Sequence, residues 1–176
     1  MTAFLQHIGL DVRIEEGARG FIDGVRIDKG RLFVDPKCPV SGLLHEAGHL
    51  AIVPAQFRPH LSGDLREAFL RMFEELDRQG LDPDHPLSRA VVQASDPEAT
   101  AWAWAAGEHL GIPPQRRILD AEYDGTGNIV RFQLQRCAYL GIHGLSHAGF
   151  CATRAMLAKP EKPAYPKLAF WTQPVL

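Results

Sequence analysis

The chain has 176 residues, the size of one ordinary domain, and 45 % of them are apolar, which excludes a disordered chain. Its 19 basic and 21 acidic side chains give a net charge of −2 without any basic run, so we expect no direct nucleic-acid binding. The first residues do not resemble a signal peptide, and no segment is long enough to span a membrane. The three widely spaced cysteines, Cys38, Cys137 and Cys151, predict reduced thiols. These features predict a cytoplasmic protein without membrane contact.

The first third of the chain predicts a small antiparallel sheet. Asp-Gly and Lys-Gly pairs, which favour tight turns, separate four short apolar runs at residues 10–14, 20–22, 25–27 and 32–34. Pro36 and Pro39 end the last of these strands. A further hairpin is expected around residues 124–128, with its second strand at 129–134.

Apolar residues at helical spacing predict helices at residues 43–53, 63–79, 87–94 and 96–109. We expect Gly80 to end the second helix, and Asp96 to cap the fourth with Pro97 in its first turn. A last helix is expected at 146–158. The four prolines after it predict an extended arm, so we divide the chain into one domain at 1–158 and an arm at 159–176.

One short motif carries the clearest chemistry. Residues 45–49, His-Glu-Ala-Gly-His, form an HExxH pattern inside the first predicted helix. Positions four apart project from the same face of a helix, so His45 and His49 can bind one metal ion while Glu46 reaches a metal-bound water. The apolar neighbours of the motif indicate a buried helix, in which these polar groups need partners. The motif therefore predicts a zinc site.

Zinc bound by two helical histidines needs a third protein ligand and leaves a fourth position for water. A third histidine ten residues after the first is excluded, because that position is Ala55. We predict Glu98 as the third ligand, because it lies in the first turn of a later helix and shares a side with alanine and tryptophan residues. Asp96 is the alternative ligand, although its role as a helix cap already accounts for it.

Two other interpretations of the motif stay open. His45 and His49 can be hydrogen-bonded core histidines, with Glu46 facing solvent. The segment Glu46-x-x-His49 is also half of a carboxylate-bridged di-iron site. The chain has no second ExxH segment, and its predicted strands do not suit a helical bundle.

Residues 43–49 and 98–105 together resemble the compact gluzincins of the ImmA/IrrE type. In that family a strand precedes the HExxH helix, and a later helix carries ExxAxx(F/W)A with its glutamate on zinc. The second motif is matched by Glu98, Ala101, Trp104 and Ala105. The resemblance implies a zincin-like α+β fold, in which a small antiparallel or mixed sheet packs on the HExxH helix and a glutamate-bearing helix. The helix predicted at 63–79 makes the gap between the two motifs longer than is usual in the family.

The resemblance also implies a metallopeptidase with a narrow intracellular protein substrate. In this mechanism Zn2+ activates a water, and Glu46 accepts its proton and returns it to the leaving amine. We predict His143 as the donor that stabilises the oxyanion, with Tyr139 and His147 as alternatives in the same glycine-rich stretch. A surface or capping role is the other interpretation of these two histidines. Asp120 and Asp124 are candidates to orient a zinc-bound imidazole.

The sequence thus predicts a zinc-dependent enzyme that hydrolyses a protein or peptide. The alternative is a non-catalytic domain that zinc stabilises and that binds a partner protein without cleaving it. The intact general base Glu46 favours the enzyme. Phe170 and Trp171 in the arm can close a groove or dock on a second subunit, which predicts a homodimer through the arm.

Overall fold

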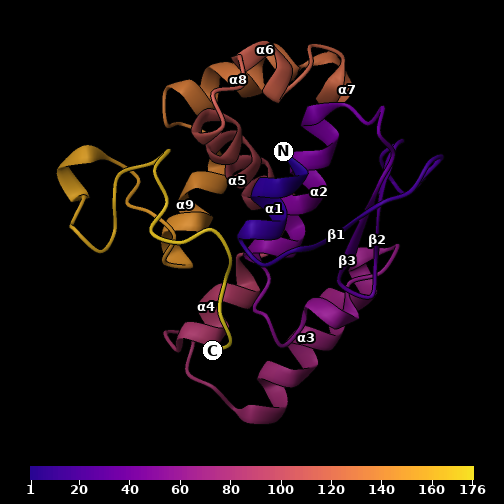
Figure 1. The fold of residues 1–176 in the computed structure, drawn as a ribbon. Coiled ribbons are helices and arrows are strands. Elements are labelled where there is room, and N and C mark those ends of the chain that lie inside the picture. Colours follow the sequence, from indigo (N-terminus) through magenta and orange to yellow (C-terminus); the bar gives the residue numbers. More distant parts are fainter.

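The chain folds into nine α-helices and one three-stranded sheet, described for residues 1–176 by a computed structural model (Figure 1). The strands are β1 (Asp11–Ile14), β2 (Val25–Asp28) and β3 (Arg31–Val34). The helices are α1 (Thr2–His7), α2 (Val40–Ile52), α3 (Leu65–Gln79), α4 (Pro86–Val92), α5 (Asp96–His109), α6 (Pro114–Arg117), α7 (Glu122–Gly125), α8 (Gly127–Gln135) and α9 (Leu140–His147). Two short 3-10 turns lie at Arg58–His60 and Ala155–Leu157. The predicted α+β class is confirmed.

The sheet is mixed, with β3 in the centre. β2 and β3 form a hairpin whose turn places Lys29 and Gly30 at positive φ, as the Lys-Gly signal predicted. β1 pairs with β3 in parallel. Residues 15–24 connect β1 to β2, which lies at the other edge of the sheet and runs in the opposite direction. The run at 20–22 is therefore part of a connection, and the expected fourth strand does not form.

The four helices predicted between residues 43 and 109 are present as α2, α3, α4 and α5. On α3 the Asp64 carboxylate accepts a hydrogen bond from the Arg66 amide, and Gly80 ends the helix in the left-handed conformation that glycine tolerates. Two expectations later in the chain are wrong. Residues 127–135 form helix α8, because Val130 and Leu134, four residues apart, are both buried on one helical face. The helix expected at 146–158 instead runs from Leu140 to His147 and ends before Gly149, which has φ 96°.

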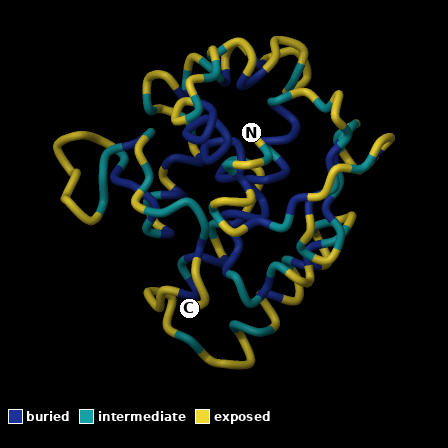
Figure 2. The backbone as a smooth tube through the Cα atoms, viewed as in Figure 1, coloured by how far each residue is buried: buried dark blue, intermediate teal, exposed yellow.

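Helix α2 occupies the middle of the molecule, between the sheet and α5, and α9 lies on the far side of α5 (Figure 1). The buried residues gather in this central layer (Figure 2). Helices α2 and α5 cross very closely, since a Cβ atom added at Gly48 would lie 2.6 Å from the carbonyl oxygen of Ala99. Small residues at the crossing bring the first turn of α5 next to the HExxH face of α2.

Residues 159–176 cross the body of the protein as an extended segment. The Tyr165 hydroxyl donates to the Ala101 carbonyl at 2.9 Å, and the Trp102 indole donates to the Trp171 carbonyl at 2.9 Å. The Gln173 amide donates to the Ala51 carbonyl at 2.7 Å. Trp171 also packs edge-on against Trp102, with ring centroids 5.9 Å apart. The segment therefore covers both α2 and α5. No helix has the length and apolar character needed to cross a membrane.

Replacing Gly48 with alanine tests the close crossing of α2 and α5. Alanine is favoured over glycine inside a helix by about 1 kcal/mol, so without a clash the protein would become more stable. Because the new Cβ atom meets the Ala99 carbonyl, we expect the free energy of unfolding to fall by about 1–3 kcal/mol. Denaturant unfolding of Gly48→Ala measures this, with the exposed Glu74→Ala on α3 as a control expected to stay within about 0.5 kcal/mol. Equal or higher stability of Gly48→Ala would contradict the crossing.

Candidate metal centre

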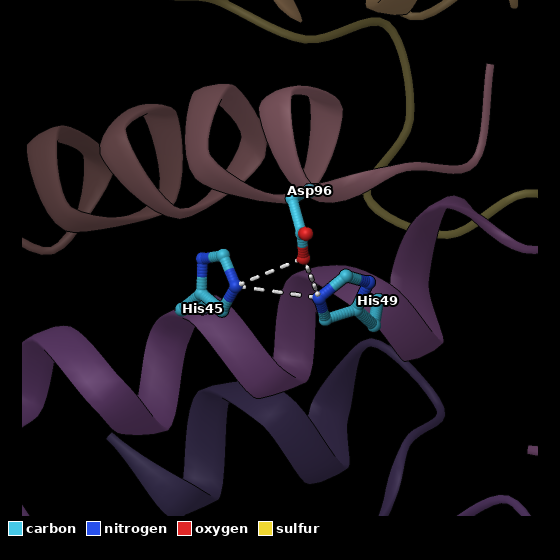
Figure 3. Close-up of side chains that lie close together, drawn as sticks. All are labelled: His45, His49 and Asp96. Atoms are coloured by element: carbon cyan, nitrogen blue, oxygen red, sulfur yellow. Dashed lines mark hydrogen bonds and ion pairs between the residues drawn. The ribbon is translucent and has the colours of Figure 1, made fainter. Parts of the chain in front are cut away.

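The two histidines of the HExxH motif point in the same direction from α2 (Figure 3). Their Nε2 atoms are 3.3 Å apart, and their ring planes are nearly perpendicular. The His49 side chain is 3 % exposed and that of His45 is 17 % exposed. The helical spacing predicted from the sequence therefore brings both imidazoles to one point.

Asp96, the first residue of α5, faces the two imidazoles from the neighbouring helix (Figure 3). Its Oδ1 atom lies 3.1 Å from His49 Nε2 and 3.7 Å from His45 Nε2. Hydrogen bonds from both histidines hold the pKa of the Asp96 carboxyl well below its usual value. Two nitrogen donors and one oxygen donor thus converge from two helices.

The spacing of these three donor atoms can be compared with that of a zinc site. Ligands about 2.0 Å from a tetrahedral zinc ion lie about 3.3 Å from one another. The three distances of 3.1, 3.3 and 3.7 Å scatter around that value. The donor set of two imidazoles and one carboxylate is also a set that zinc accepts. The residues present therefore fit a tetrahedral divalent metal ion with one position left for water.

Glu98, predicted as the third ligand, does not lie with the histidines. Ser95, and not Asp96, caps α5, and Glu98 completes a capping box by accepting hydrogen bonds from the Ser95 amide and hydroxyl. The Glu98 carboxylate is buried against Gly144 of α9, where an added Cβ atom would overlap it. Two residues along a helix turn the side chain by about 200°, so Asp96 and Glu98 face opposite sides of α5. Asp96, the alternative ligand, takes the place expected for Glu98.

The sequence of α5 allows two alignments of the gluzincin motif. The pattern ExxAxx(F/W)A fits Glu98, Ala101, Trp104 and Ala105, but with aspartate in the first position it also fits Asp96, Ala99, Trp102 and Ala103. The segment repeats carboxylate, alanine and tryptophan at intervals of two, so both alignments of the motif are equally good. Only tertiary packing decides between them.

Glu46 lies beside the histidines and lines the same cavity. It is 7 % exposed, and burial raises the pKa of its carboxyl. The two imidazoles lower that pKa and the Asp96 carboxylate raises it, both to a smaller extent. The structure therefore places a buried carboxyl group with a raised proton affinity next to the three donor atoms.

Two cavities meet at His45 and Asp96. The larger, of about 770 Å³, also contains Glu46 and His49, and its wall is the apolar side of α3 with Leu65, Phe69, Leu70 and Phe73. The smaller, of about 460 Å³, extends towards α6 and α7 and contains Thr100, Tyr123 and Tyr139. Phe21, whose side chain is fully exposed, borders both cavities. The donor atoms therefore lie in an open cleft with space on either side.

The donor predicted from the glycine-rich stretch is not in this cleft. His143 is exposed on α9 and lines neither cavity, and His147 is also exposed. The glycines of this stretch let α9 approach the start of α5 instead, because a Cβ atom at Gly141 would overlap the Pro97 carbonyl. Of the three candidates only Tyr139 lines a cavity of the site.

The predicted partners of the imidazoles are also placed elsewhere. Asp120 pairs with Arg131, and Asp124 borders the smaller cavity without a hydrogen bond to either histidine. The group beside His45 is Thr100, whose hydroxyl lies 3.3 Å from His45 Nδ1 and 2.8 Å from the Tyr123 hydroxyl. Sequence reasoning missed Thr100, although its position four residues after Asp96 places both on one face of α5.

Comparisons with known proteins give no indication of the function of this chain. No family model matches the chain, and searches of curated proteins and of solved structures found no match either. The fold and the site thus define an α+β protein with a cluster of two histidines and one aspartate suited to a metal ion.

Proposed function

We propose that the protein is a zinc-dependent metallopeptidase of the zincin type, with His45, His49 and Asp96 as metal ligands and Glu46 as general base. The observation that carries this proposal is the convergence of three donor atoms at tetrahedral spacing in an open cleft, with Glu46 beside them. The gluzincin resemblance is modified in one respect, because aspartate replaces glutamate as the third ligand.

The residues of the cleft divide the work of hydrolysis. Zinc held by His45, His49 and Asp96 would supply a Lewis acid that polarises the peptide carbonyl and lowers the pKa of a bound water. Glu46 accepts the proton of that water and returns it to the leaving amine. Burial of Glu46 suits this exchange, because a raised pKa brings its proton affinity closer to that of the groups it serves.

A non-catalytic zinc-stabilised domain that binds a partner protein is the competing function. A structural zinc site is closed by a fourth protein ligand, whereas a catalytic site keeps that position open. Around His45, His49 and Asp96 no fourth histidine, cysteine or carboxylate joins the cluster, and the space beside it is cleft. This arrangement favours the enzyme. We retain the cytoplasmic location as part of the proposal, since the three cysteines are unpaired.

The walls of the cleft favour a polypeptide substrate. Space on both sides of the donor atoms allows an extended chain to pass across them in either direction. On the α3 side the wall carries Phe69 and Phe73 one turn apart, with Phe73 43 % exposed to solvent. We propose that this wall accepts a bulky apolar side chain next to the cleaved bond.

Alanine variants of the three proposed ligands should lose zinc, whereas the alanine variant of Glu98 should retain it. His45→Ala, His49→Ala and Asp96→Ala should each reduce bound zinc well below one ion per chain, because each removes a donor. Glu98→Ala is the matched control, and it should keep the zinc while losing about 1 kcal/mol of stability with the capping box. Metal analysis and chelator competition measure the zinc, and chemical unfolding measures the stability. Unchanged zinc affinity in Asp96→Ala would exclude aspartate as the third ligand.

Glu46→Gln should separate catalysis from metal binding. The substitution keeps size and shape and removes the base, so zinc content should stay the same while cleavage falls by a factor on the order of 10² or more. The measurement is turnover of a peptide pool by both proteins at equal zinc content. Equal turnover would reject the proposed mechanism. No turnover by either protein over a broad pool would favour the non-catalytic binding domain.

Shortening the α3 wall should weaken selectivity for apolar side chains. In Phe73→Ala we expect kcat/KM to fall roughly tenfold for peptides with leucine or phenylalanine beside the cleaved bond, and to change little for peptides with alanine there. Phe132→Ala on α8 is the matched control, because Phe132 is also exposed and lies outside both cavities. A uniform fall for all peptides would show that Phe73 does not select side chains.

A further inference from the structure

His45 and His49 differ in the surroundings of their Nδ1 atoms, which face away from the candidate metal position. The Nδ1 atom of His45 is 3.3 Å from the Thr100 hydroxyl, whereas the Nδ1 atom of His49 is buried without a hydrogen-bond partner. Thr100 is 1 % exposed, so its hydroxyl must find its partners inside the protein. The Tyr123 hydroxyl at 2.8 Å is one of them.

Metal binding by His45 would determine which groups donate and which accept in this hydrogen-bond network. A histidine that offers the lone pair of Nε2 to a metal ion carries its proton on Nδ1. The His45 Nδ1–H can then donate to Thr100 Oγ1, which keeps one proton of its own to donate to the Tyr123 oxygen. In this direction the Thr100 hydroxyl accepts from His45 and donates to Tyr123, and His45 Nε2 is left free for the ion.

The backbone around Tyr123 is held in the shape that brings its ring to Thr100. Tyr123 and Asp124 both adopt left-handed conformations, with φ of 57° and 55°, which are uncommon for residues other than glycine. The Tyr123 carbonyl accepts hydrogen bonds from the Thr126 hydroxyl at 2.6 Å and the Thr126 amide at 3.1 Å, which fix this turn. Adjacent residues in such uncommon conformations are typical of a functional site.

We infer that Thr100 is a positioning residue for the metal centre: supported by Tyr123, its hydroxyl holds the His45 ring in the orientation and tautomer that present Nε2 to the ion. This inference rests on the proposed metal site and adds two residues to it. Removal of a group that hydrogen-bonds the second ring nitrogen of a ligand histidine typically lowers metal affinity by 10- to 100-fold. Valine has the shape of threonine but cannot accept the Nδ1 proton.

The first test is zinc affinity by competition with a chromophoric chelator. Thr100→Val should bind zinc 10- to 100-fold more weakly than the wild type, and Thr100→Ser should restore most of the affinity because it restores the hydroxyl. Tyr123→Phe should give a smaller loss, since it removes only the support of Thr100. The control is Thr172→Val, the same substitution at a threonine whose hydroxyl donates to the Ile8 carbonyl and not to a group of the candidate site. It should leave zinc affinity unchanged. Wild-type affinity in Thr100→Val would overturn the inference while the metal site stands.

The second test is the tautomer of His45, read from 15N NMR of its ring nitrogens and assigned by comparison with His45→Ala. In the metal-free protein the Asp96 carboxylate competes for a proton on Nε2, so the test is the change between variants: Thr100→Val should lower the share of the Nδ1–H tautomer, because valine cannot accept that hydrogen bond. This measurement does not depend on zinc or activity. A wild type that binds no zinc would therefore refute the proposed function, while a His45 tautomer unaffected by Thr100→Val would refute the inference.

Discussion

The close crossing of α2 and α5 is the constraint on which the site depends. Gly48 on α2 lies against the backbone of Ala99 on α5, so the two helices approach to a distance that larger side chains would prevent. At this separation a short aspartate side chain in the first turn of α5 reaches imidazoles on α2 directly. Gly48 on α2 and the small residues of α5, which look featureless in the sequence, thereby allow Asp96 to approach the two histidines.

Burial of polar groups in the central layer needs a compensating role. Glu46 and His49 are nearly inaccessible, and ionised or unpaired groups are costly inside a protein. The hydrogen bonds within the structure do not satisfy all of them, since His49 Nδ1 is left without a partner. The proposed metal site would give His49 Nε2 and Glu46 a role that accounts for their burial.

Helices α2 to α5 and the HExxH face could be predicted from the sequence because their signals are local. Helical spacing, the Asp64 cap and Gly80 each depend on a few neighbouring residues, and α2 and α3 were found within a few residues of their ends. The carboxylate that joins the two histidines could not be predicted reliably, because Asp96 and Glu98 both fit the motif on α5 and tertiary packing selects which of them faces α2. With Ser95 as the cap, Asp96 is free to face the histidines and Glu98 becomes part of the cap. Which of the two carboxylates faces α2 is fixed by how the whole of α5 packs between α2 and α9.

The hairpin expected near residue 124 was wrong for a different reason. Glycine and asparagine do form a turn there, but a turn does not specify whether strands or helices follow it. The apolar residues of α8 are buried at helical spacing against a core that is assembled from distant parts of the chain. Contacts of that kind also bring Tyr123 to Thr100, and no local pattern in the sequence reports them.

The extended segment that covers α2 and α5 has a consequence for how the protein is made. Tyr165, Trp171 and Gln173 follow every helix in the order of synthesis, yet their hydrogen bonds reach the backbones of the two helices that carry the site. While the ribosome still holds these residues, the backs of both helices remain uncovered. The nascent chain therefore covers this side of α2 and α5 only after the segment has emerged, later than the two helices themselves can form.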